Sequence, residues 1–250
     1  MKPQLSVRNR GFTLLETVIA IGVLAVLLTG FMFVFAPAAA GIKKAISAQE
    51  ADRLTTALEQ ELVTLRTGSD TETTGFAKAF NRIMKSTNKD TALMVYQYRA
   101  DLTAPPRSDG TPPAVASLTD ANGKLTKQPG KDYILQPMVR LCSDSAFKNS
   151  DLAATEGTVY YVKCTQLIFT GGSLTPNPNL TAGIVDPNNP GTSYSSSDAT
   201  PPYPDGTIAF KADFYPLPNK NAASFTTTLN AAFGKTALPP LFSRNLAVRR

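Results

Sequence analysis

The apolar segment from Phe12 to Ala40 constrains the fold of this chain more than any other feature. Its polar side chains are limited to Thr13, Glu16, Thr17 and Thr29. The segment is longer than the roughly 20 apolar residues that a helix needs to cross a bilayer. We therefore expect residues 12–40 to form a membrane-spanning helix.

Positive charge stands on both sides of this segment. Lys2, Arg8 and Arg10 precede it with no acidic residue among them, and Lys43 and Lys44 follow it. Positive residues near a span favour the cytoplasmic side, whereas long exported domains cross largely regardless of their charge. We expect a single-pass protein of a bacterial inner membrane, with its N-terminus in the cytoplasm and its C-terminal domain in the periplasm or outside the cell.

Glu16 is the one ionisable residue inside the apolar segment. A charged side chain in a bilayer costs about 2.5–3.5 kcal/mol on insertion scales, so such a residue usually marks a functional site. A glutamate in the first turn of a helix is also favoured by the helix dipole. Glu16 therefore has two interpretations: it takes part in function, or it only caps its own helix or reaches the membrane surface.

Three kinds of N-terminal segment fit the apolar run. A plain signal anchor explains the run but not Glu16. A secretory signal peptide cut near the small residues 36–40 would need an apolar region about half as long and without a carboxylate. In the third interpretation the chain is cut between Gly11 and Phe12 on the cytoplasmic side, and the apolar helix is kept. Only this one uses every residue.

The segment Arg10-Gly11-Phe12-Thr13-Leu14-Leu15-Glu16 resembles the N-terminus shared by type IV pilins and the pseudopilins of type II secretion systems. The resemblance covers roughly the first 55 residues. It implies that a prepilin peptidase cuts after Gly11 and that the new amine of Phe12 is methylated. It also implies that Glu16 meets the amine of a neighbouring subunit in a fibre, where pairing offsets the desolvation of both charges.

A second helical pattern follows Gly41. Apolar residues recur every three or four positions, as an amphipathic helix requires, at Ala51, Leu54, Leu58, Leu62 and Leu65. Arg66 is expected in the last turn and Gly68 as the C-cap. Such a stripe fits either a coiled-coil seam or packing on the chain's own domain, and the resemblance implies a β-sheet against it.

The rest of the chain is expected to be rich in β-strands. Alternating and apolar runs predict strands at 93–99, 133–142, 158–170 and 207–215, and Pro137 suggests an edge or a bulge. Helices are predicted at 71–85 and, more weakly, at 221–234. Residues 101–131 and 171–206 are expected to be irregular loops, with Asn179 in a glycosylation sequon by pattern only. The arginines at 244, 249 and 250 suggest a solvated, frayed tail.

The composition offers little for catalysis. The chain has no histidine and two cysteines, so it lacks imidazole ligands and cannot form a four-sulfur zinc site. The sequence contains no phosphate-binding loop, dinucleotide-type glycine pattern or calcium loop. Three of the net +6 charges precede Gly11, and the remaining excess is too small to predict nucleic-acid binding. We predict a protein that is not an enzyme and holds no cofactor or metal.

Cys142 and Cys164 both lie in segments that read as strands. In an oxidising compartment they would form one disulfide, and the alternative is two buried thiols. Strand geometry alone does not fix their separation. The disulfide is the prediction.

Taken with these patterns, the resemblance implies an α+β, pilin-like fold in which a long N-terminal helix packs on an antiparallel, β-rich domain with long irregular loops. The expected parts are a leader at 1–11, a membrane helix at 12–40, an amphipathic continuation at 41–68 and an exported domain at 69–250. The expected function is a structural, minor subunit of a pilus-like fibre or secretion pseudopilus, with the pseudopilin J type as one relative. Its partners would be prepilin peptidase, other subunits and the inner membrane. The alternative is a signal-anchored binding module that joins no fibre.

Overall fold

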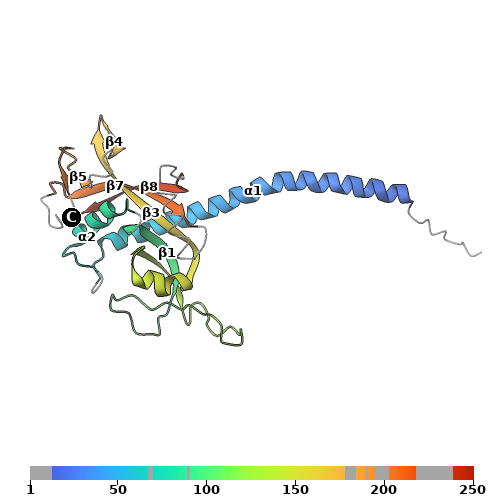
Figure 1. Ribbon diagram of the computed structural model, residues 1–250, viewed down its shortest axis with the longest axis horizontal. Helices are drawn as coiled ribbons and strands as arrows, with labels where there is room; N and C mark the ends of the chain where they lie inside the picture. Colours follow the sequence, from blue (N-terminus) through green and yellow to red (C-terminus); the bar gives the residue numbers. More distant parts are fainter. Residues whose placement is uncertain are drawn as a thin grey trace, which may run out of the picture. The chain divides into compact units, whose positions relative to one another are not determined.

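The computed structural model describes residues 13–66, 70–88, 91–177, 184–189, 191–194, 203–217 and 239–250 (Figure 1). These residues belong to two compact units, Met1–Ile46 and Ser47–Arg250. Several predictions lie outside the described residues: the leader at 1–11, Phe12, the C-cap at Gly68, the sequon at Asn179 and the helix at 221–234.

Helix α1 (Leu14–Val63) is continuous over 50 residues and contains Pro37. Within the described residues it is the one helix long and apolar enough to cross a membrane. Its large apolar side chains as far as Ile46 are exposed; Leu14, for example, is 85% exposed. A run of exposed apolar side chains of this length is unsuited to water and suits a lipid environment.

The last third of α1 buries its apolar stripe. Ala51, Leu54, Leu58 and Leu62 are at most 1% exposed and belong to the core of the second unit. The stripe therefore packs on the chain's own domain, as the resemblance implied. The helix ends at Val63, earlier than predicted, so Leu65 is 44% exposed and Arg66 follows the helix.

The sheet of the second unit is antiparallel throughout, which confirms the α+β prediction (Figure 1). Its order is β2-β1-β3-β7-β8. The strands are β1 (Leu93–Ala100), β2 (Ile134–Leu141), β3 (Thr155–Thr170), β7 (Thr207–Pro216) and β8 (Phe242–Arg249). The predicted loop at 171–206 contains the short strands β4 (Ser173–Pro176), which pairs with β3, and β5 (Ile184–Val185) and β6 (Ser193–Tyr194), which pair with each other.

The sequence predicted one edge strand of the sheet correctly and missed the other. Pro137 lies in β2, which is an edge strand as predicted, because proline has no N–H for a second neighbour. The predicted frayed tail at the C-terminus is wrong. Residues 242–249 instead form β8, whose eight residues pair with β7 without a register shift.

Both faces of the sheet are covered at β1 and β3. On one face, the stripe of α1 and helix α2 (Gly75–Lys85) pack against Leu93, Val95 and Phe210. On the other, Tyr96, Tyr98 and Phe147 form a second cluster with the π-helix η2 (Phe147–Asp151) and the 3-10 helix η3 (Leu152–Ala154). Every residue of β1 is consequently buried, as expected for a strand covered on both sides.

The predicted disulfide is not formed in the structure. Cys142 follows β2, where its N–H donates to the carbonyl of Ala92 beside β1, whereas Cys164 lies in β3. Strand β1 stands between them, which separates the two backbones by about 10 Å, whereas a disulfide needs Cα atoms less than about 7 Å apart. The two side chains also belong to the clusters on opposite faces of the sheet.

This arrangement predicts the thiol chemistry of the chain. Burial raises the pKa of Cys164 to about 12, so its thiol should not react at pH 8 in the folded protein. The half-buried Cys142 should react faster. We expect a thiol titration of the unreduced protein to find two thiols after unfolding. Fewer than one would establish the disulfide and contradict the structure.

Gly75 allows α2 to start against the end of α1. It follows the N-cap Thr74, whose hydroxyl accepts a hydrogen bond from the N–H of Ala77 at 3.1 Å. A Cβ at Gly75 would collide with the carbonyl oxygen of Val63. Alanine is otherwise the better helix former by about 1 kcal/mol, so propensity alone would make Gly75→Ala stabilising.

We expect Gly75→Ala to lower the free energy of unfolding by about 1–3 kcal/mol, because the two helix ends must move apart. Urea unfolding of the full chain in detergent, followed by circular dichroism, measures this. Gly206→Ala is the matched control, since a Cβ there meets no atom within 4 Å. A Gly75→Ala variant as stable as the control would contradict this prediction, because it would show that the two helix ends can move apart without a loss of stability.

Candidate functional site

Thr13 and Glu16 form a reciprocal hydrogen-bonded pair at the start of α1. The Oγ1 of Thr13 accepts from the N–H of Glu16 at 3.2 Å, and Oε2 of Glu16 accepts from the N–H of Thr13 at 3.2 Å. The Thr13 hydroxyl lies 3.1 Å from the same carboxylate oxygen. This is a capping box, which satisfies backbone donors that the first turn of a helix leaves without partners.

The structure thus shows Glu16 capping its own helix, one of the two interpretations of this residue. Its carboxylate nevertheless remains exposed and lies among exposed apolar side chains, including Leu15 at 68%. A capping box needs only a hydrogen-bond acceptor, which glutamine also supplies. The cap therefore accounts for a polar side chain at this position but not for a charge inside an apolar helix.

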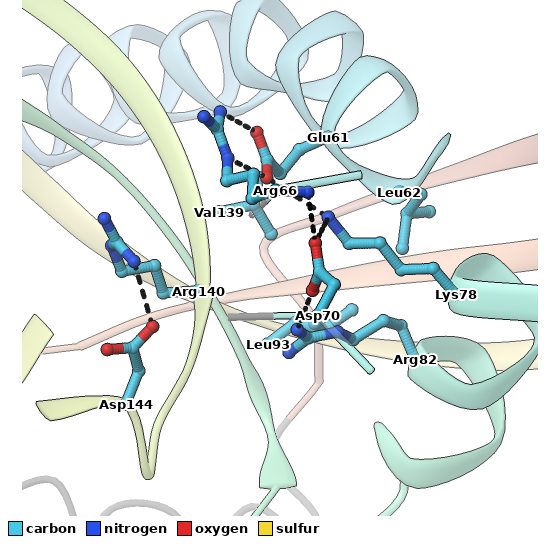
Figure 2. Close-up of a pocket in the computed structure, with 10 residues that line it drawn as sticks. All are labelled: Glu61, Leu62, Arg66, Asp70, Lys78, Arg82, Leu93, Val139, Arg140 and Asp144. Carbon is cyan, nitrogen blue, oxygen red and sulfur yellow. Dashed lines mark hydrogen bonds and ion pairs between the residues drawn. The ribbon is translucent and has the colours of Figure 1, made fainter. Parts of the chain in front are cut away.

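A cluster of charged residues, not anticipated from the sequence, lies beyond the end of α1. Asp70 is at its centre, and its side chain is 2% exposed. Lys78 of α2 lies 3.0 Å from one carboxylate oxygen, and Arg82 lies 3.0 Å from the other (Figure 2). The N–H of Arg66 also donates to Asp70 at 2.8 Å. Burial by itself would raise the pKa of Asp70, but these hydrogen bonds and charges outweigh it and hold the pKa below its usual value.

The same cluster closes the end of α1. Lys78 donates to the carbonyl of Thr64, just past the helix, and lies 3.4 Å from Glu61. Arg66 forms a bidentate ion pair with Glu61, with donor–acceptor distances of 2.6 Å from Nε and 2.5 Å from Nη2. Cations are favourable at the C-terminal end of a helix, where carbonyls lack partners. We name Glu61, Arg66, Asp70, Lys78 and Arg82 the helix-end cluster.

A second network surrounds Arg140 of β2. Its guanidinium lies 2.7 Å from Asp109, 3.0 Å from Asp144 and 3.2 Å from Asp151, and its side chain is 4% exposed. Arg107 and the hydroxyl of Tyr96 each reach Asp151 at 2.6 Å. Since Arg107 and Asp109 belong to the predicted loop 101–131, this network ties that loop to the sheet.

The Arg140 network predicts a loss of stability in acid. Although burial opposes ionisation, hydrogen bonds from Thr111 and the charge of Arg140 lower the pKa of Asp109 to about 2. A carboxyl whose folded pKa lies below its unfolded value stabilises the fold above the unfolded value, near 4, and loses this contribution as pH falls to 2.

We expect the contribution of Asp109 to be about 2 kcal/mol. Urea unfolding at pH 5 and at pH 2.5 should show a smaller loss of stability on acidification for Asp109→Asn than for the unaltered chain. Asp132, whose carboxylate accepts a hydrogen bond from the N–H of Gln128 in an exposed turn, is the control site. Equal acid sensitivity of the Asp109→Asn variant and the unaltered chain would contradict this role.

The helix-end cluster and two residues of the second network, Arg140 and Asp144, line one pocket (Figure 2). Its apolar lining residues are Leu62, Leu93 and Val139. The charged atoms of this lining pair mainly with one another, and the pocket lies where α1, α2 and β2 meet. Among the described residues no group of three or more cysteine, histidine or acidic side chains is placed to hold a metal ion. The sequence signal for the helix-end cluster was weak, because its members are scattered over residues 61–82 and look like ordinary surface charges.

Comparison with known proteins adds one finding at the N-terminus. Residues 7–32 match the family described as the prokaryotic N-terminal methylation motif. This match includes Gly11, Phe12 and Glu16 and ends within the apolar half of α1. No curated protein and no solved structure matches the chain.

Proposed function

From the premise that this chain carries the N-terminal methylation motif, consistent with the type IV pilin and pseudopilin family, we propose that it is a minor structural subunit of a pilus-like fibre or secretion pseudopilus. One observation carries the proposal: the motif runs directly into a helix whose apolar side chains are exposed from Leu14 to Ile46. The motif and the helix together fit a protein anchored in the inner membrane.

Maturation would begin at the cytoplasmic face of the membrane. Prepilin peptidase would cut between Gly11 and Phe12, and the amine of Phe12 would then be methylated. Glycine suits the position before the cut because it has no side chain and a permissive backbone. The basic leader residues would hold this bond at the cytoplasmic face. The whole apolar helix remains after this cut, unlike after signal-peptide cleavage near Ala40.

Assembly would use Glu16 and the new amine. In the single chain the carboxylate accepts hydrogen bonds from Thr13. In a fibre, the positive amine of a neighbouring Phe12 would become its partner, and each charge would offset the cost of burying the other. The exported domain would then be carried on the outside of the helical bundle. The long insertions at 101–131 and 171–206 favour a minor subunit over a simple repeating one.

The mature N-terminus tests this proposal. We expect N-terminal sequencing and intact mass of the protein extracted from membranes to give a chain that starts at Phe12, with one added methyl group. A start near Gly41 would identify a secreted protein, and an uncut Met1 a plain signal anchor. Gly11→Leu is the matched control, since a bulky side chain at the cut should leave membrane insertion intact and prevent processing.

A further inference from the structure

Strand β8 forms one edge of the sheet. It is the last strand in the order β2-β1-β3-β7-β8, and its register with β7 is continuous from Phe242, opposite Phe214, to Arg249, opposite Thr207. No hydrogen bond joins the other side of its backbone to any part of the chain that the structure describes. An edge of this kind offers a row of N–H and C=O groups to another extended chain.

The two edges of the sheet differ in protection. At the β2 edge, Pro137 removes an N–H and so hinders a further strand. Strand β8 has eight residues, no proline and no bulge. Asn245, Ala247 and Arg249 are exposed, so the outer face beside this edge is accessible. The β8 edge is thus suited to accept a strand.

The charged residues of strand β8 are all positive. Residues 239–250 include three arginines and no acidic residue. Arg244 pairs with Asp52 at 2.7 Å, and Arg250 donates to the carbonyl of Tyr203 at 3.3 Å and lies over the ring of Phe76. Arg249 is exposed and forms no ion pair within the described ranges. It leaves an uncompensated positive charge at one end of the edge.

We propose that the β8 edge binds, by strand addition, an extended acidic segment of a partner protein, with a carboxylate opposite Arg249. Backbone hydrogen bonds supply affinity in this mode of recognition, and side chains on alternate residues supply specificity. Opposite charges directly across two strands are favourable and like charges are not. A second copy of β8 would bring further positive charge and no carboxylate to this edge, so the charges favour an acidic partner over self-pairing. The inference holds whether or not the chain assembles into a fibre.

The test uses the full chain in detergent and a capped eight-residue peptide of alternating valine and glutamate. We expect the peptide to slow hydrogen exchange at alternate amides of β8, as measured by mass spectrometry with fragmentation. A peptide with glutamine in place of glutamate should bind about fivefold more weakly, since one cross-strand ion pair is lost. Methylation of alternate peptide nitrogens should abolish binding, because it removes the backbone donors.

Arg249→Gln separates this site from general attraction to a basic protein. It should weaken binding of the glutamate peptide about fivefold and leave the glutamine peptide unaffected. Lys124→Gln removes an exposed charge from the loop 117–126 and should change neither. The inference fails if β8 gains no protection at millimolar peptide, if the methylated peptide protects it equally, or if Arg249→Gln has no more effect than Lys124→Gln. Protection that rises with protein concentration alone would indicate self-pairing and also overturn it.

Discussion

Replacing Asp70 with alanine is expected to lower the free energy of unfolding by about 3–5 kcal/mol, because it leaves buried cations without their counter-charge. The Lys78 side chain is 4% exposed and lies 3.0 Å from Asp70. Lys78 would retain Glu61, but only at 3.4 Å. Arg82 would lose the carboxylate that it reaches at 3.0 Å. The variant should therefore loosen α2 and the end of α1 together.

Urea unfolding of the full chain in detergent measures this effect. Asp52→Ala is the matched control, because Asp52 and Arg244 form an exposed pair whose side chains are 47% and 54% accessible. Such a pair contributes about 0–1 kcal/mol. Adding Lys78→Met to Asp70→Ala should recover part of the loss, since an apolar side chain of similar length needs no counter-charge. If Asp70→Ala lowered the free energy of unfolding no more than Asp52→Ala, the helix-end cluster would not stabilise the fold.

The contrast between these two aspartates shows what the sequence could predict. Strands such as β3 could be predicted because hydrophobic and β-branched residues cluster along a short run. The ion pairs of Asp70 could not be predicted, because its partners lie 8 and 12 positions away and meet it only after α2 folds back on the end of α1. Pattern reading works on neighbours along the chain, whereas this cluster is defined by tertiary packing.

The predictions of a frayed C-terminal tail and of a disulfide differ from the structure for related reasons. The three arginines of residues 239–250 suggested a solvated end, yet Phe242, Leu246 and Val248 face the core side of β7 in register with Phe214, Phe210 and Ile208. Apolar residues on alternate positions were the available signal, and the charges between them obscured it. For the cysteines, the order of the strands decided the outcome, and strand order is not written in local sequence.

The capping box, by contrast, could be read directly from the spacing of Thr13 and Glu16, since a threonine followed three residues later by a glutamate is the signature of a helix start. What the spacing leaves open is why the residue at this position is a charged glutamate. Glutamine would cap the helix equally well and would cost less in lipid. The proposed pairing with a neighbouring amine requires the charge, and this difference provides a test.

We expect Glu16→Gln to leave membrane insertion and leader cleavage intact and to lower incorporation into a fibre by about tenfold or more. The reason is that a buried amine without its counter-charge costs about 3–5 kcal/mol, and 1.4 kcal/mol already corresponds to tenfold. Incorporation would be measured as the share of processed protein in sheared fibres, beside the share that stays in membranes. Glu16→Leu removes both the cap and the charge and should do at least as much harm.

Thr17→Val is the matched control, since Thr17 lies one residue further along the same helix and its hydroxyl donates to the backbone carbonyl of Thr13 at 3.1 Å. It should assemble as the unaltered chain does. A Glu16→Gln variant that assembled normally while Glu16→Leu did not would show that Glu16 acts as a helix cap alone. Equal failure of both variants, with Thr17→Val intact, would identify the charge itself as the requirement, because glutamine preserves every other property of the first turn.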